Sequence, residues 1–290
     1  MPNQEKIATE FNPSFSDKDY QAIAEFVHKT AGINLLEGKK ELVRTRLGKR
    51  MRQLQMTDFR VYFQYVMNDD TGEEIIFLLD ALATNLTSFF REDQHFTFMS
   101  KIFLPALEKR RRAKGGSRRL RVWSAACSSG EEPYTIGMVI MEKHPYFGLG
   151  GDCKILATDI STKVLNIAQQ GLYGPEKVKT VPASLLGKYF KKVNSDRGHQ
   201  MYQVSSQLRE LIVFRRLNLI EPLPFKNPLD LIFCRNVMIY FDKETISRLI
   251  NKYYQILAPG GYLFIGHSES LSGLDHKFKY VEPCVYLKEL

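Results

Sequence analysis

The stretch RLRVWSAACSSGEEPYTIGMV, residues Arg119–Val139, combines the pattern of a buried strand, a loop of small residues and the start of a helix. The apolar alternation predicts a strand over Leu120–Ser124. The loop Ala125–Gly130 carries only small side chains, so a ligand can lie against its backbone. Pro133 suits the first turn of a helix, where its missing N–H group leaves no hydrogen bond unmade. Doubly wound α/β folds use this unit to bind a nucleotide or a nucleoside.

The residues of this loop indicate which ligand it binds. Dinucleotide-binding loops have the pattern G-x-G-x-x-G, in which bare amides approach a pyrophosphate. Here Gly130 is the only glycine of the loop, and Glu131 and Glu132 follow it. Two carboxylates repel phosphate but suit a positively charged ligand that carries hydroxyl groups. S-adenosylmethionine has a sulfonium, an ammonium group and a ribose diol, so the loop favours a methyltransferase over a dehydrogenase.

The composition is that of a globular chain. Its 290 residues, 44% of them hydrophobic, suffice for one large α/β domain and a smaller one. The start MPNQEKIATE lacks the apolar stretch of a signal peptide, and no run of about 18 apolar residues predicts a membrane span. The four cysteines form no C-x-x-C pair, which favours a cytoplasmic protein with reduced thiols. The six histidines show no metal-ligand spacing, so we expect no metal site.

Basic residues outnumber acidic ones by 41 to 32, which gives a formal net charge of +9. They are concentrated in two segments, Lys39–Arg52 and Lys109–Arg121. Such segments suit nucleic acid or an acidic protein surface, and charge alone does not choose between these partners. No exposed apolar stripe stands out, so we expect a monomer.

The first part of the chain has the pattern of a small all-helical domain. Ser16 is placed to cap a first helix, and a second is predicted over Lys40–Leu54. Further helices are expected near Phe59–Val66 and Glu73–Ala83. The second helix presents basic residues away from its apolar face: Arg46, Lys49, Arg50 and Arg52.

The rest of the chain alternates strands and helices, which predicts a Rossmann-like, mostly parallel sheet covered on both faces. Strands are expected at Leu120–Ser124, Lys154–Thr158, Leu211–Arg216, Leu229–Cys234, Gly261–Gly266 and Val285–Lys288, the last two antiparallel. Helices are expected at Pro133–Lys143, Thr162–Gln170 and Lys243–Leu257. Between Tyr189 and Phe214, the short pieces YFKKV, QMYQV and LIVFR indicate a small antiparallel excursion.

These patterns divide the chain as follows. We predict a flexible N-terminus over residues 1–15, a helical domain over 16–83, a linker over 84–100, and a methyltransferase domain over 101–290 with a β-subdomain inserted at 188–216.

Polar residues end several predicted strands and are candidates for ligand contacts. Asp159 ends the second strand, where an acidic residue typically binds ribose hydroxyls; a helix N-cap is the alternative role. Asn218 follows the next strand and is placed for an adenine edge, or is a plain turn residue. Arg235 and Asn236 end the fourth strand without the Pro-Pro-Tyr that commonly follows in methyltransferases acting on amino groups. An amide or exocyclic-amine acceptor is therefore disfavoured.

Four motifs together resemble the chemotaxis receptor glutamate methyltransferase family, CheR. The matching segments, in chain order, are NLTSFFRE (Asn85–Glu92), WSAACSSGEEPY (Trp123–Tyr134), FCRNVMIYFD (Phe233–Asp242) and GHSES (Gly266–Ser270). The resemblance implies S-adenosylmethionine-dependent methylation of glutamate side chains on chemoreceptors, with S-adenosylhomocysteine as the product. It also implies a partner with an acidic helical surface, no nucleic acid, and contact with membranes only through receptors.

The resemblance also implies roles for individual residues. The cofactor would be bound by Asn85, Thr87, Arg91, Glu132, Asp159, Asn218, Leu219, Arg235 and Asn236. Arg91 and Tyr240 would lie near the transferred methyl group, and Arg46, Lys49, Arg50 and Arg52 would face the receptor. In one place the chain departs from the family pattern, because the loop KVNSDRGHQ has the single glycine Gly198 in place of a Gly-x-Gly. We therefore predict that binding of a receptor C-terminal peptide is absent or altered.

Two alternatives remain open at this point. A nucleic-acid methyltransferase is suggested by the charge of +9, and a binding protein that senses S-adenosylmethionine or S-adenosylhomocysteine would need the same contacts. A hydrolase built on GHSES is excluded, because this segment does not have the G-x-S-x-G pattern of a nucleophile elbow.

Overall fold

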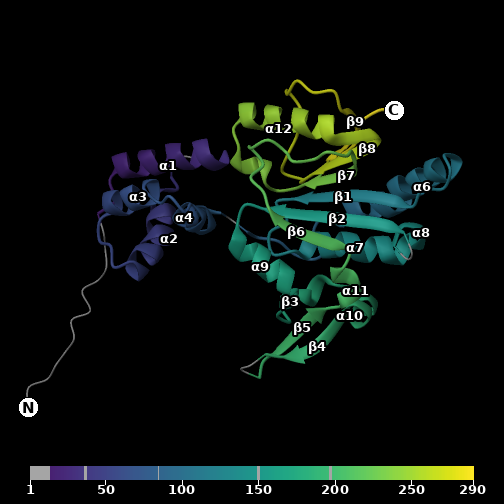
Figure 1. Ribbon diagram of the computed structural model, residues 1–290, viewed down its shortest axis with the longest axis horizontal. Helices are drawn as coiled ribbons and strands as arrows, with labels where there is room; N and C mark the ends of the chain where they lie inside the picture. The colour runs from purple at the N-terminus through teal and green to yellow at the C-terminus, as the bar shows by residue number, and fades with distance from the viewer. Residues whose placement is uncertain (1–13, 36–37, 84, 149–150, 196–197) are drawn as a thin grey trace, which may run out of the picture. The chain divides into compact units, whose positions relative to one another are not determined.

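The computed structural model describes residues 14–35, 38–83, 85–148, 151–195 and 198–290. The chain divides into two compact units, Met1–Ala83 and Thr84–Leu290 (Figure 1). Of the N-terminus predicted to be flexible, residues 1–13 lie outside the described residues. Phe15 is buried, with its ring centroid 4.2 Å from that of Phe59, so the packed part of the first unit begins before Ser16.

The first unit consists of helices close to those predicted from the sequence. They are α1 (Asp17–Ala31), α2 (Lys40–Gln53), α3 (Phe59–Met67) and α4 (Glu73–Leu82). Ser16 caps α1 as expected: its hydroxyl accepts from the Asp19 amide, and the Asp19 carboxylate accepts from the Ser16 amide. Gly32 ends the helix in the left-handed conformation that glycine adopts without strain.

A buried ion pair joins three helices of this unit. Glu74 of α4 is 3% exposed and accepts three hydrogen bonds from the Arg50 guanidinium of α2, the shortest 2.6 Å long. The Tyr62 hydroxyl of α3 donates to the same carboxylate at 3.0 Å. Removing Arg50 would leave the buried Glu74 carboxylate without its ionic partner, and an uncompensated buried charge typically costs about 3–5 kcal/mol.

The second unit is built on a seven-stranded sheet with the order β6-β2-β1-β7-β8-β10-β9. The first five strands pair in parallel, and β10 pairs antiparallel with β8 and with β9. The antiparallel end predicted from the sequence is thus confirmed, although β9 was not foreseen. The bounds are β1 (Arg119–Ala125), β2 (Asp152–Asp159), β6 (Ile212–Arg216), β7 (Leu229–Cys234), β8 (Leu257–Ile265), β9 (Lys279–Glu282) and β10 (Val285–Leu287).

Helices cover both faces of this sheet. Neighbouring residues of β1 point to opposite sides: Val122 packs into one apolar cluster with residues of α7, and Trp123 into another with Tyr253 of α12. The helices and turns of this unit are α5 (Gln94–Phe98), η1 (Met99–Phe103), α6 (Leu104–Ala113), α7 (Glu131–Lys143), α8 (Pro145–Gly148), α9 (Thr162–Gln170), η2 (Val178–Thr180), α10 (Ala183–Tyr189), α11 (Ser206–Arg209), η3 (Met238–Tyr240) and α12 (Lys243–Ile256). Helix α7 begins two residues before the predicted start at Pro133.

The small antiparallel sheet is present, but its third strand is not the one expected. It has the order β3-β5-β4, with β3 (Leu172–Tyr173), β4 (Phe190–Asn194) and β5 (Gln200–Val204), and it lies apart from the main sheet, next to α10 and α11 (Figure 1). The piece LIVFR is instead the edge strand β6 of the main sheet, parallel to β2, which confirms the strand expected at Leu211–Arg216. It pairs there because its apolar residues Ile212 and Phe214 enter the main core. Asp196 and Arg197 of the loop KVNSDRGHQ lie outside the described residues.

The strand order reverses at the carboxyl ends of β1 and β7, where doubly wound sheets form a ligand-binding crevice. After β1 the chain moves to β2 on one side, and it later returns to β7 on the other side. Open α/β sheets bind ligands where the strand order reverses in this way. Ala125 is level with Thr158 of β2 and with Cys234 of β7, so the loops that follow these three strands meet at one place.

Candidate active site

The loop between β1 and α7 has a strained backbone. Ala126 and Ser128 have φ angles of 59° and 48°, in the left-handed region that side chains rarely adopt, and Gly130 follows at 94°. Such strain costs of the order of 1–3 kcal/mol per non-glycine residue and collects at functional sites. Gly130 is also needed for space, because a Cβ there would lie 2.8 Å from the Cβ of Ala168 in α9. The strained backbone and the close packing indicate that this loop has a function beyond connecting β1 to α7.

Asp159, at the end of β2, holds this loop in place. Its carboxylate accepts hydrogen bonds from the Ser128 amide at 2.8 Å and from the Ser161 amide at 2.9 Å. Ser161 itself caps α9, with its hydroxyl accepting from the Val164 amide. The N-cap role that was an alternative for Asp159 thus belongs to Ser161, and Asp159 links the β1–α7 loop to the segment before α9.

Arg235, the residue after β7, joins three segments of the site. Its side chain is 3% exposed and donates to Glu132 at 2.9 Å and to Glu92 at 3.0 Å. It also donates to the backbone carbonyl of Arg91. One guanidinium thereby fixes the first turn of α7, the 91–92 segment and the end of β7 relative to one another.

The pKa values of the two carboxylates that pair with Arg235 are shifted in opposite directions. Burial alone would raise the pKa of Glu92, but the Arg235 guanidinium and the Asn236 amide hold it below its ordinary value. Burial raises the pKa of Glu132 in spite of Arg235 and of the Ser124 hydroxyl, which donates to it at 2.7 Å. Glu92 is therefore the firmly ionised partner of the pair.

The charges at this place match a cationic ligand. The carboxylates of Glu92, Glu132 and Asp159 outnumber the guanidinium groups of Arg91 and Arg235, of which Arg91 lies 3.8 Å from Glu92. Acceptor oxygens at the ends of β1 and β2 suit an ammonium group and a ribose diol. This set of acceptor oxygens and negative charges thus fits S-adenosylmethionine better than a phosphate-bearing cofactor.

Glu269, in the segment GHSES, organises the exit of β7. Its carboxylate accepts from four backbone amides at 2.6–3.0 Å, those of Asn236, Val237, Met238 and Gly266. The clamp holds Asn236 at a φ of 58°, from which its side chain donates to Glu92 at 3.2 Å. Burial raises the pKa of Glu269, and the four amides act against that rise. The turn that presents Arg235 and Asn236 therefore depends on a residue far along the chain.

The remaining residues predicted to bind the cofactor lie in the same unit. The Asn85 carbonyl accepts from the Ser128 hydroxyl at 3.0 Å, which brings the 85–92 segment to the β1–α7 loop. Asn218 and Leu219 are buried just beyond β6, next to the end of β2. Thr87 is half-buried, and so is Tyr240, which lies in the turn η3 and was predicted to lie near the transferred methyl group.

The basic residues of α2 are not equivalent. Arg46 donates to the Leu82 and Ala83 carbonyls at the end of α4, and Arg50 pairs with Glu74. These two guanidinium groups contribute to the fold of the first unit. Lys49 and Arg52 are exposed.

Two residues of this arrangement were not predicted from the sequence, although both lie in the motifs that resemble the CheR family. Glu92 ends NLTSFFRE, and Glu269 belongs to GHSES. A lone carboxylate in a motif does not reveal its partners, which here are residues more than a hundred positions away for Glu92 and about thirty for Glu269.

Nucleophilic catalysis by cysteine is disfavoured. All four cysteines are free thiols. Burial raises the pKa of Cys127, Cys153, Cys234 and Cys284. A thiol with a raised pKa is a poor nucleophile because the thiolate is the reactive form.

The fold and the site define an S-adenosylmethionine-dependent methyltransferase, and comparisons with known proteins agree. The family model "CheR methyltransferase, SAM binding domain" matches residues 85–287, and "CheR methyltransferase, all-alpha domain" matches residues 18–83. The chain belongs to the CheR methyltransferase family.

Similar proteins cover nearly the whole chain. A chemotaxis protein methyltransferase of Borreliella burgdorferi is 38% identical over 99% of this chain and 99% of its own length. Chemotaxis protein methyltransferase 2 of Pseudomonas aeruginosa is 38% identical over 94% of this chain and 93% of its own. The chemotaxis protein methyltransferase of Escherichia coli is 36% identical over 94% of this chain and 91% of its own length.

Within the described ranges, no helix combines the length and apolar character needed to span a bilayer.

Proposed function

We propose that this protein transfers the methyl group of S-adenosylmethionine to glutamate side chains of chemoreceptors in the cytoplasm. The relatives named above are chemotaxis protein methyltransferases, and their similarity to this chain extends over nearly their full length. The observation that carries the proposal is the carboxylate-rich site around Arg235, which suits a cationic cofactor.

Each part of the cofactor has a proposed place in the site. Asp159 would accept from the ribose hydroxyls, and Asn218 and Leu219 would flank the adenine. Glu132 would bind the amino-acid end, with Asn85, Thr87, Arg235 and Asn236 around it. Arg91 and Tyr240 would lie near the methyl group. This distribution follows the order of the strand ends from β6 through β2 and β1 to β7.

The chemistry needs little from the protein beyond orientation. The bound cofactor supplies an electrophilic methyl group on its sulfonium. A glutamate side chain, with an ordinary pKa of about 4.3, is already ionised at neutral pH and needs no general base. Its oxygen forms the bond to the methyl carbon as the carbon–sulfur bond breaks, and the electron pair stays on sulfur. Holding the two reactants in line is worth roughly 7–11 kcal/mol.

Receptor recognition would depend on exposed positive charge in the first unit. Lys49 and Arg52 are exposed on α2 and suit an acidic helical surface. Arg46 and Arg50 would contribute indirectly, by holding α2 to α4. The single glycine of the β4–β5 loop supports our prediction that receptor-tail binding is absent or altered.

The direct test is methyl transfer from radiolabelled S-adenosylmethionine to chemoreceptor-containing membranes, followed by mild base. We expect label that is released as methanol, which identifies a carboxyl methyl ester. Membranes without chemoreceptors are the control, and DNA is tested as an alternative acceptor. Base-stable label, or label on DNA, would contradict the proposal. Arg91→Ala should lower the transfer rate more than it lowers affinity for S-adenosylhomocysteine.

A further inference from the structure

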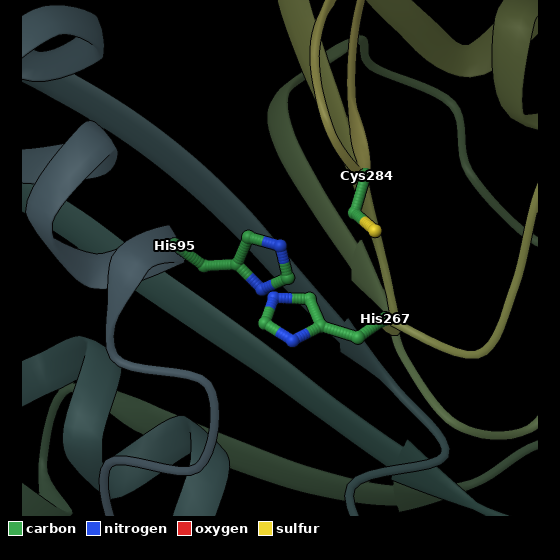
Figure 2. A group of neighbouring side chains, drawn as sticks. All are labelled: His95, His267 and Cys284. Atoms are coloured by element: carbon green, nitrogen blue, oxygen red, sulfur yellow. The ribbon is translucent and has the colours of Figure 1, made fainter.

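Two histidines and a cysteine from distant parts of the chain lie together next to the Arg235 cluster. His95 is in α5, His267 lies two residues beyond β8, and Cys284 is in the turn between β9 and β10. Figure 2 shows the two imidazole rings beside each other, with the Cys284 sulfur on the neighbouring segment. One nitrogen or sulfur atom from each residue lies within 4.8 Å of the others. None of these side chains has a part in the proposed methyl transfer.

His95 is the most informative member of the group. It is 2% exposed, and neither ring nitrogen has a hydrogen-bond partner among the described residues. The Glu92 carboxylate lies 3.7 Å from its Nδ1 atom, beyond hydrogen-bond distance. A buried polar group without a partner costs about 1–3 kcal/mol. A ligand bound to the ring would offset that cost.

Cys284 is held toward the group by an unusual turn. Its φ angle is 64°, a left-handed conformation in which glycine or asparagine is the common choice. The Ile265 amide donates to the Cys284 carbonyl at 3.0 Å, which fixes the turn against the end of β8, two residues before His267. A strained residue that carries a metal-binding side chain points to a function for that side chain.

We propose that His95, His267 and Cys284 bind a zinc ion. Two imidazole nitrogens and one thiolate form a donor set that suits Zn²⁺, which is usually four-coordinate. Glu92 is placed to supply the fourth ligand, since its Oε2 atom lies 3.7 Å from His95 Nδ1 and 4.0 Å from His267 Nε2. This proposal replaces our expectation from sequence spacing that the chain has no metal site.

The distances allow such a site after small side-chain rotations. With Zn–N bonds of about 2.0–2.1 Å, neighbouring nitrogen ligands in a tetrahedral site are about 3.4 Å apart. The observed separations of up to 4.8 Å are therefore somewhat too long and must shorten on binding. His267 can move, because its side chain is 44% exposed. The Cys284 thiol gives up its proton to the solvent when the sulfur binds the metal.

The experiment uses the full chain, freed of metal by a chelator and titrated with Co²⁺ as a spectroscopic substitute for Zn²⁺. We expect saturable binding with thiolate-to-cobalt charge-transfer absorption and the visible bands of tetrahedral cobalt. One equivalent of Zn²⁺ should abolish these bands. This readout does not depend on methyl transfer, so it tests the metal site whether or not the proposed function is correct.

Variants assign the signal to the proposed ligands. Cys284→Ser should remove the charge-transfer band, and His267→Gln should weaken cobalt binding at least about tenfold. His199→Gln is the matched control, because His199 is an exposed histidine near the β4–β5 loop. It should bind cobalt like the unaltered protein. Circular dichroism checks that each variant is folded. Absence of saturable binding in the unaltered protein, or an unchanged band in Cys284→Ser, would overturn the proposal.

Discussion

At the scale of single residues, burial and position decide which of several similar side chains act at the site. Asp152 and Asp159 lie at opposite ends of β2. Asp152 is an exposed partner of Arg121 at 2.6 Å, whereas Asp159 is buried and accepts from two loop amides. The carboxyl end of the strand faces the crevice, so the same residue type has a structural surface role at one end and a proposed ligand role at the other.

Asp159→Asn should weaken the binding of S-adenosylhomocysteine at least about tenfold. The amide keeps the size of the side chain but replaces an acceptor oxygen by a donor that faces backbone N–H groups. A lost hydrogen bond to a charged group costs about 1.5–3 kcal/mol. Isothermal calorimetry measures the effect, with Asp152→Asn as the matched control on the same strand. Equal affinities of the two variants would argue against a role for Asp159 in cofactor binding.

Cys153 of β2 allows a prediction about alkaline stability. Burial raises the pKa of its thiol to about 12. Above about pH 9 the unfolded chain loses this proton while the folded chain keeps it, so the free energy of unfolding falls as pH rises toward 12, by up to about 1.4 kcal/mol per pH unit. Cys153→Val should remove this component. Urea unfolding at about pH 8 and about pH 11 measures it, and an equally steep loss in both proteins would refute the prediction.

At the scale of elements, the turn after β7 depends on a clamp from the segment after β8. The four amides that donate to Glu269 come from both segments, and the turn presents Arg235 and Asn236 to the crevice. Arg235 in turn holds the first turn of α7 through Glu132. Strand ends, a helix start and the 91–92 segment thus form one connected arrangement, in which a positioning residue can affect the site without touching a ligand.

Glu269→Gln should lower both stability and cofactor affinity, because an amide nitrogen would face backbone donors. We expect a loss of about 1–3 kcal/mol in the free energy of unfolding and weaker binding of S-adenosylhomocysteine. Denaturant unfolding and calorimetry measure the two effects. Glu244→Gln, an exposed partner of Arg248 on α12, is the control and should change neither. A stable variant with full affinity would show that the clamp is dispensable.

At the scale of the whole molecule, the formal charge of +9 is compatible with several partners. The structure distinguishes basic residues that stabilise the fold from exposed ones that can attract a partner. Arg50 is committed to the buried Glu74, whereas Lys49 on the same helix is exposed. Long-range attraction to an acidic receptor would therefore depend on residues such as Lys49, and it would weaken as salt rises.

Lys49→Glu should slow the methylation of receptor membranes at low ionic strength, by about tenfold if steering dominates. The difference from the unaltered protein should disappear near 1 M salt, where the screening length falls to about 3 Å. Initial rates over a salt series measure this effect. Lys191→Glu makes the same charge change on exposed β4 of the second unit and serves as the control. Equal rates for the two variants at low salt would refute the assignment.

Much of the fold was predictable because its signals are local. The bounds of β7 and α9 agree with the prediction, since an apolar run interrupted only by Asp230 and a serine cap mark them in the sequence. The strained loop after β1 was also recognisable from its small residues. Strand β3, two residues long, and the edge strand β9 carry too little apolar pattern to be recognised.

The sequence by itself determined the alternation of strands and helices, the site loop and the family, because short runs of residues carry these features. The tertiary structure alone decided that β3 completes the small sheet, that Arg50 pairs with the buried Glu74, and that Glu269 clamps the turn after β7. It also brought together the proposed zinc ligands, which lie at positions 95, 267 and 284. Contacts between residues so far apart depend on how the strands are ordered in space, and no local pattern encodes that order.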